Sequence, residues 1–120
     1  MKTKAREEYT CPLQLTHHII RGKWKPIILW QLKGGNVSLA DLQRGIKGIN
    51  QKMLLQHLKE LQEFDMVDKK QYEGYPLRVE YSLTERGSRM LDVVNSMQEI
   101  GIEMMREDGK EELLRGKGLI

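Results

Sequence analysis

The sequence predicts a mainly α-helical fold with one small β-hairpin, and three observations support this fold class. Leu54, Leu58 and Leu61 recur at the spacing of one helix face, so residues 51–64 are expected to form an amphipathic helix. Residues 78–83 alternate between apolar and polar side chains, as a half-buried strand does. Good capping side chains precede three of the predicted helices, and these are Ser38, Asn50 and Thr84.

Helices are expected over five stretches of the chain. Pro12 and Pro26 lie near helix starts, where a backbone N–H would have no intrahelical acceptor and its absence costs nothing. The pair Gly34-Gly35 ends the second helix, and Ser38 opens a short third one. The expected ranges are 12–20, 25–33, 39–44, 51–64 and a long last helix that Thr84 caps.

A β-hairpin is expected between the last two of these helices. Its predicted strands are 66–72 and 78–83, and residues 73–77 form the tip. The side chains of the second strand divide between two faces, with Val79, Tyr81 and Leu83 on one and Arg78, Glu80 and Ser82 on the other. Two helices, a glycine-containing turn over 45–49, a further helix and a hairpin follow one another in the order of a winged helix-turn-helix domain.

Length and composition predict a single folded domain. The chain has 120 residues, of which 39% are hydrophobic and 31% charged, values ordinary for a globular protein. We expect the domain to span 11–105, after an N-terminal arm (1–10) and before a polar, glycine-dotted tail (106–120) that frays. No apolar run approaches the roughly 18 residues of a membrane span, and no secretory signal begins the chain. The single cysteine, Cys11, suits a reducing cytoplasm.

The positive charge of the chain is concentrated in its first half. Residues 9–59 contain eight Lys or Arg and one acid, Asp41, which gives this segment a net charge of +7. Residues 60–120 contain nine bases and 14 acids, a net charge of −5. A basic face attracts polyanions, although the same bases scattered over a solvated surface would need no partner. Charge alone therefore favours a nucleic acid only weakly.

The helix over 51–64 is the candidate recognition helix for duplex DNA. Such a helix buries one face and uses the other to reach base edges or phosphates in the major groove. Polar side chains on an amphipathic helix often only solvate it, but here the turn and the hairpin also lie in the required order. We expect Gln51, Lys52, Leu55 and Gln56 at base edges, Lys59 and Arg44 at phosphates, and Arg78 at the backbone or minor groove.

Several motifs resemble those of the HxlR-type winged helix-turn-helix regulators, over residues 11 to about 105. The matching stretches are Cys11-Pro12, Gly22–Lys25, Gly48–Leu54 and Pro76–Thr84. The resemblance implies a homodimer that binds operator DNA and whose terminal helices form the dimer interface. The sequence departs from the family pattern at the wing (Leu77), at the recognition-helix cap (Asn50) and in the last helix (Ile100).

The last helix carries apolar side chains at the spacing of a helix–helix contact. Met90, Val94, Met97, Gly101 and Met104 follow a 4-3-4-3 spacing. This stripe predicts that the last helix pairs with a second copy of the chain.

Cys11 is a candidate sensor of an oxidant or electrophile. It directly precedes a predicted helix, and no acid lies between residues 9 and 40, so its surroundings favour the thiolate that reacts with such compounds. Some members of the resembling family sense oxidants or quinones through a cysteine near this position. The alternative is a small packing residue, which is a common role of free cysteine.

These features predict a DNA-binding transcription regulator, with repression favoured because a repressor only has to occlude a promoter. The alternative is a winged-helix module that binds proteins and not DNA. An enzyme is not expected, because no nucleophile or phosphate-binding motif is present. His17 and His18 point about 100° apart on a helix, and His57 and Cys11 complete no zinc spacing, so neither metal nor cofactor is expected.

Overall fold

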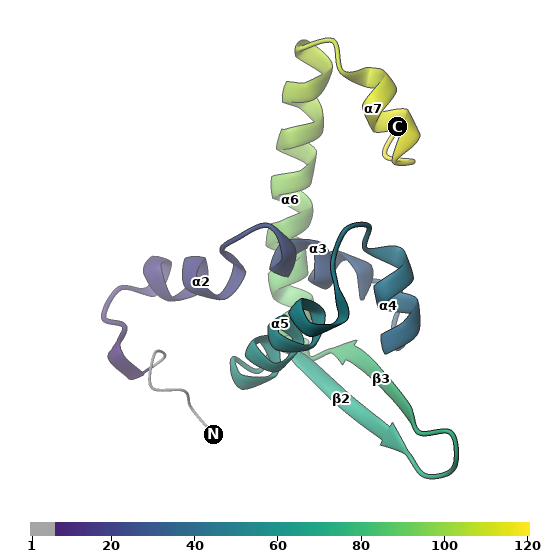
Figure 1. Cartoon of the computed structure of the whole chain (residues 1–120). Coiled ribbons are helices and arrows are strands. Elements are labelled where there is room, and N and C mark those ends of the chain that lie inside the picture. The colour runs from purple at the N-terminus through teal and green to yellow at the C-terminus, as the bar shows by residue number, and fades with distance from the viewer. Residues whose placement is uncertain (1–6) are drawn as a thin grey trace.

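The computed structural model describes residues 7–120, so most of the expected arm, residues 1–6, lies outside the described residues. In Figure 1 the long helix α6 stands upright, with α2, α3, α4 and α5 around its lower half, α7 beside its upper end, and a hairpin that projects below. The predicted mainly α-helical winged helix-turn-helix fold is confirmed. The elements are α2 (Pro12–Ile20), α3 (Trp24–Gln31), β1 (Val37–Ser38), α4 (Leu39–Gly45), α5 (Gln51–Glu63), β2 (Val67–Tyr72), β3 (Arg78–Leu83), α6 (Glu85–Glu107) and α7 (Glu111–Gly116).

Local capping fixes where α4 and α5 begin. The Ser38 hydroxyl accepts a hydrogen bond from the Asp41 N–H at 3.1 Å, and the Asn50 side chain accepts one from the Met53 N–H at 2.8 Å. Each bond satisfies a backbone donor that has no acceptor within its helix. Both predicted caps are confirmed, so the start of α5 is determined by the sequence next to it.

The predicted stripe of α5 forms the centre of the core. Leu54, Leu58 and Leu61 are completely buried and belong to one cluster with Ile28 and Leu29 of α3. Burial of a leucine side chain stabilises a fold by roughly 1.5–3 kcal/mol, so these contacts hold α5 in one orientation. The opposite face of α5 must therefore point to solvent.

The hairpin belongs to a three-stranded antiparallel sheet with the order β1-β3-β2. β2 and β3 pair from Val67 with Leu83 to Tyr72 with Arg78, as the predicted hairpin requires. The strand β1 was not predicted, because two residues are too short to show an alternating pattern. Its Val37 pairs with the buried Tyr81 of β3, which joins the hairpin to the helical part of the domain.

A tight junction connects the start of β2 to the start of α6. The Thr84 hydroxyl accepts a hydrogen bond from the Gly87 N–H at 2.8 Å, which confirms the predicted cap. The same hydroxyl donates to the carbonyl oxygen of Asp65 at 2.7 Å, and the Thr84 N–H donates to that of Met66 at 3.0 Å. A Cβ atom on Gly87 would lie 1.9 Å from the Met66 oxygen. Only glycine therefore allows the two backbones to approach this closely.

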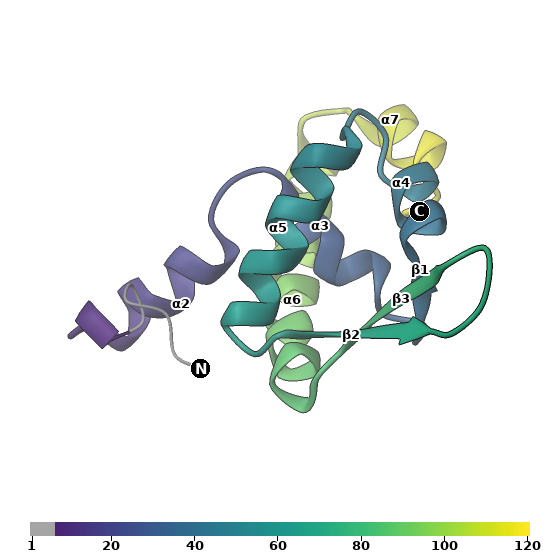
Figure 2. The same ribbon diagram turned by 60° about the horizontal axis from the view of Figure 1, so that its bottom comes forward.

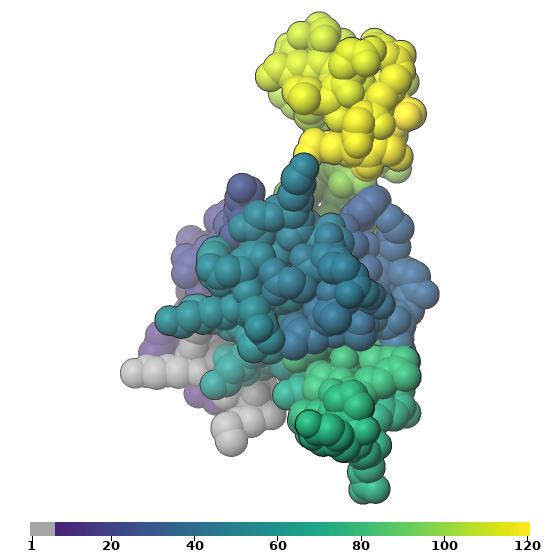
Figure 3. Space-filling view, turned by 45° about the vertical axis from the view of Figure 1, so that its right-hand side comes forward, coloured from purple at the N-terminus to yellow at the C-terminus, as the bar shows by residue number. Residues whose placement is uncertain are grey.

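The prediction of a frayed tail over 106–120 was wrong. α6 continues to Glu107, and the chain then turns and forms α7, whose Leu114 is 1% exposed. Figure 3 shows this end of the chain as a lobe above the body of the domain. The local sequence is polar and rich in glycine, so the ordering of this segment depends on contacts with α6 that a local pattern does not reveal.

The predicted stripe of α6 divides between two faces of the helix. Met90 and Val94 are buried in the core of their own chain and cannot contact a partner. The apolar side chains of α6 that remain exposed follow a 4-3-4 spacing; Met97 and Met104 belong to the predicted stripe, and Val93 and Ile100 replace Val94 and Gly101. The exposed side chains are Val93 (50% exposed), Met97 (49%), Ile100 (58%) and Met104 (58%).

Candidate nucleic-acid interface

All five side chains of α5 that were expected to contact DNA are exposed; four lie on its outer face, and Gln51 lies in the first turn, on the stripe of Leu54 and Leu58. The leucines on the other side are buried, and at 100° per residue this places the polar stripe toward solvent. In Figure 2 α5 and the hairpin lie on the same side of the molecule. Glu63, the one exposed acid of α5, lies in its last turn. The exposed candidates are Gln51, Lys52, Leu55, Gln56 and Lys59.

The turn between α4 and α5 is fixed by contacts that set the direction of α5. Gly48 has a φ angle of +94°, a left-handed conformation that favours glycine. The Gln31 side-chain amide of α3 donates to the carbonyl oxygen of Gly45 at 3.2 Å, and that of Gln43 donates to the carbonyl of Ile49. Side-chain hydrogen bonds therefore attach the turn both to α3 and to α4, the helix that precedes it.

Lys25 does not contribute to the basic surface, although it counts toward the net charge of residues 9–59. It is 5% exposed, and its ammonium group lies 2.6 Å from a carboxylate oxygen of Glu60. Burial raises the pKa of Glu60, but the hydrogen bond and charge of Lys25 outweigh burial, so the net pKa lies below its ordinary value of 4.5. This pair neutralises the charge of Glu60 on α5.

Arg44 is exposed but already has a partner. Its guanidinium forms an ion pair with Asp41, one turn earlier on α4. Both side chains are more than half exposed, so water screens the pair and it contributes little to stability. Arg44 would have to exchange this carboxylate for a phosphate in order to bind DNA.

The hairpin presents further basic groups. Arg78 lies 2.6 Å from Glu80, and this largely buried carboxylate also accepts a hydrogen bond from the Tyr72 hydroxyl at 3.0 Å. Lys69 and Lys70 of β2 are both exposed. These two lysines were not among the residues expected to contact DNA, although they lie in a strand of the predicted wing.

Cys11 occupies the residue before α2, as predicted. Its backbone is extended (φ −111°, ψ 120°), and its carbonyl oxygen accepts the Leu15 N–H at 3.1 Å. The side chain is half-buried. A thiol here is partly accessible to a small reagent.

His18 is a packing residue. Its ring lies between those of Tyr9 and Phe64, with centroid distances of 5.3 and 5.5 Å. Burial, together with the charges of Arg21 and Lys25, lowers the pKa of His18 below 6.5. Over residues 7–120 no three His, Cys, Asp or Glu side chains come together as metal ligands do, and no helix there is long and apolar enough to cross a membrane.

The fold and this exposed helix define a winged helix-turn-helix protein of the DNA-binding, transcription-regulating class. The chain belongs to the HxlR-like helix-turn-helix family, whose model matches residues 19–109. The resemblance drawn from the sequence motifs is thereby confirmed.

Three related proteins illustrate this membership. The chain is 39% identical to MalR of Fusobacterium mortiferum over 99 residues, which are 82% of this chain and 93% of MalR. It is 33% identical to the uncharacterized HTH-type transcriptional regulator YkvN of Bacillus subtilis over 94% of this chain and 98% of YkvN. The structure of the redox regulator HypR in its reduced form matches with a TM-score of 0.76 and 34% identity, over 84% of this chain and 99% of HypR. HypR has also been solved in an oxidized form, with a TM-score of 0.73.

Proposed function

We propose that the protein is a homodimeric repressor that inserts α5 into the major groove of operator DNA. The observation that carries this proposal is the exposed surface of α5 beside the wing, formed by Lys52, Leu55, Gln56 and Lys59 on its outer face and by Gln51 in its first turn. A helix fixed on one side by buried leucines can present the other side to base edges at little conformational cost.

The candidate residues divide into two roles. Gln51, Lys52 and Gln56 read base edges, because an amide matches adenine and a lysine matches guanine, and Leu55 contacts a thymine methyl group. Lys59 and Arg44 bind phosphates on either side of the helix, and Arg78 binds the backbone or the minor groove. Lys69 and Lys70 point to opposite faces of the wing, so one of the two adds a phosphate contact there.

The dimer forms through the exposed apolar stripe of α6. Val93, Met97, Ile100 and Met104 lie along three turns and are each about half exposed. A contiguous apolar patch of this kind is typical of a protein–protein contact. Two copies related by a twofold axis would place their recognition helices about one DNA turn apart, roughly 34 Å. Repression then requires only that the dimer occludes a promoter.

The first prediction concerns sequence reading by α5. Gln56→Ala should weaken binding by about 1–3 kcal/mol at one base pair of the operator, because it removes a base-edge contact. Lys59→Ala should weaken binding to all sequences alike and reduce the salt dependence of the affinity. Fluorescence anisotropy against DNA from the region upstream of the gene, at several salt concentrations, measures both effects. Lys59 is a better choice than Arg78 for this test, because Arg78→Ala also removes the partner of Glu80.

Gln14→Ala, an exposed glutamine on α2, is the matched control and should bind as the unmodified protein does. Light scattering of the same preparation should give the mass of two chains. A selected binding motif that is unchanged by Gln56→Ala would contradict the assigned helix face. A monomer, or an affinity that does not depend on salt, would contradict the mode of binding and favour a protein-interaction module.

We also propose that oxidation of Cys11 regulates DNA binding. Cys11 is half-buried at the start of α2, and the relative HypR is named a redox regulator. Because the chain has one cysteine, a disulfide of Cys11 can form only with the cysteine of a second chain or with a small thiol. Either product would alter the packing of α2 at a distance from the face of α5.

The second prediction follows from this single thiol. Treatment with diamide, which accepts two electrons and two protons as two thiols form a disulfide, should change operator affinity severalfold in the native protein. Cys11→Ser should bind DNA normally and lose this response. Mass spectrometry and non-reducing gels identify the product. An unreactive thiol, or the same response in Cys11→Ser, would leave Cys11 as a packing residue.

A further inference from the structure

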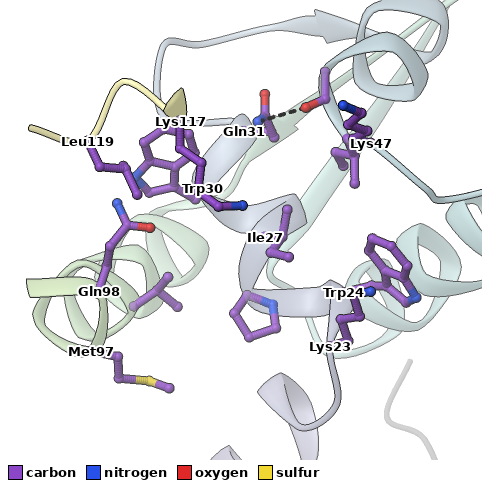
Figure 4. A pocket seen from close by; sticks show the side chains of 14 residues that line it. Lys23, Trp24, Ile27, Trp30, Gln31, Lys47, Met97, Gln98, Lys117 and Leu119 are labelled. Atoms are coloured by element: carbon purple, nitrogen blue, oxygen red, sulfur yellow. Dashed lines mark hydrogen bonds between the residues drawn. The ribbon is translucent and has the colours of Figure 1, made fainter. Parts of the chain in front are cut away.

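A cleft of about 590 Å³ lies between the helix-turn-helix and the C-terminal end of the chain. One wall is α3, a second is the turn after α4, and a third is the middle of α6. The C-terminal segment closes it with Lys117 and Leu119 (Figure 4). This volume is in the range of about 300–1,000 Å³ that is usual for small-molecule sites.

The lining of the cleft combines flat aromatic surfaces with positive charge. Both tryptophans of the chain, Trp24 and Trp30, line it. Three lysines also line it, and none of the described lining residues is an acid. Figure 4 shows Trp24 with Lys23 toward one end, Trp30 with Lys117 toward the other, and Ile27 between them. The floor between the two ends is otherwise mostly apolar.

We propose that this cleft binds an aromatic carboxylate. An indole ring offers a rigid face on which a second flat ring can stack, and an ammonium group at the cleft edge can form a charge-assisted hydrogen bond with the carboxylate. Lys23 lies 4.6 Å from the centre of the Trp24 ring and Lys33 lies 3.0 Å from that of Trp30, so each indole already has a cation over one face. A ligand ring must therefore stack on the other face or displace that lysine. An uncharged aromatic compound would form no ion pair with the three exposed lysines, and a small inorganic anion would leave the apolar floor uncovered.

The cleft borders the turn that precedes the recognition helix α5, so a bound ligand can affect the orientation of α5. Its wall includes Gly45 and Lys47, which belong to the turn that directs α5. The hydrogen bond from Gln31 to Gly45 crosses this edge (Figure 4), and the Trp24 ring lies against Gly48, 3.6 Å from where a Cβ would be. An occupant that displaces either contact alters the orientation of α5 relative to α3. The expected change in DNA affinity rests on the proposed function.

The cleft also borders the proposed dimer face, because Met97 belongs to both. A second copy of the chain is therefore the competing occupant, and it would fill the apolar part of the cleft. The three lysines favour the aromatic carboxylate over a second copy. Lys23, Lys47 and Lys117 come from three separate segments and surround the apolar floor.

The two tryptophans make the test specific to this site. In ¹H–¹⁵N spectra of the full chain without DNA, the two indole N–H signals, assigned with Trp24→Phe and Trp30→Phe, report on the cleft and not on the stripe of α6. Titration with 2-naphthoate should shift both signals to saturation. The uncharged 2-naphthalenemethanol should bind at least about tenfold more weakly, because it forms no ion pair.

Charge variants identify the anion contact. Lys117→Gln and Lys23→Gln should each weaken naphthoate binding about threefold to tenfold, as expected for partly exposed ion pairs. Lys110→Gln, an exposed lysine of the same C-terminal segment outside the cleft, is the matched control and should change nothing. Thermal melts confirm that each variant is folded.

Equal affinity for the acid and the alcohol would overturn the proposal. So would indole signals that neither compound moves. The affinity of the ligand-free protein for DNA is measured separately, so a failure to bind DNA is distinguishable from a failure to bind naphthoate. If both bind, 2-naphthoate should shift operator affinity in the native protein and much less in Lys117→Gln.

Discussion

Replacement of Gly87 by alanine is expected to destabilise the protein by about 3 kcal/mol or more, because overpacking here meets backbone and not a flexible side chain. A Cβ atom at this position would lie 1.9 Å from the carbonyl oxygen of Met66 and 2.9 Å from its carbon. Alanine would normally be better than glycine in a helix by roughly 0.5–1 kcal/mol, so the clash reverses the usual sign. The start of α6 and the start of β2 would have to separate, and the hydrogen bond between Thr84 and Met66 would be lost.

Urea denaturation of the variant measures this effect. Ser88→Ala is the matched control, because Ser88 is the next residue of α6 and is exposed. We expect the control to change the free energy of unfolding by less than about 0.5 kcal/mol. A Gly87→Ala protein as stable as the Ser88→Ala protein would show that the junction between the wing and α6 is not as close as the structure places it.

Glu60→Gln is expected to destabilise the protein by about 2 kcal/mol, because it leaves the charge of Lys25 buried without a counter-ion. Loss of one partner from a fully buried pair costs about 3–5 kcal/mol. The value here is lower, because the Glu60 side chain is 35% exposed and water screens it, whereas that of Lys25 is 6% exposed. Lys25→Met, which removes the buried charge itself, should cost less than Glu60→Gln.

The contribution of this pair should depend on pH in a defined direction. The pKa of Glu60 is lower in the folded protein than its ordinary value of 4.5, so its stabilisation is complete above that value and is lost as the pH falls through the folded pKa. The difference in unfolding free energy between native protein and Glu60→Gln should therefore be constant near neutral pH and shrink in acid. A difference that stays constant into acid would show that the ion pair is not its cause. Lys25→Met serves as the control, because it has no buried charge for Glu60 to compensate.

The sequence alone determined the elements whose signals are local. The caps Ser38, Asn50 and Thr84 bond to backbone groups three residues away, so a short segment contains the whole interaction. The outer face of α5 followed from the spacing of its buried leucines, because a regular helix fixes the direction of every side chain. For the same reason this spacing predicts the exposure of Lys52, Leu55, Gln56 and Lys59, whereas Gln51 is exposed because it lies in the first turn.

Tertiary structure decided the features that depend on residues distant along the chain. Lys25 is a base in the sequence, but its burial against Glu60 removes it from the surface, since α3 packs on α5. The packing of α6 likewise decided that Met90 faces the core and Val93 faces outward, which periodicity could not distinguish because both positions are apolar. The cleft depends on contacts among α3, the turn, α6 and the C-terminal segment, whose own sequence predicted no structure. Such contacts form only when segments distant along the chain come together. A pattern within one segment therefore does not predict them.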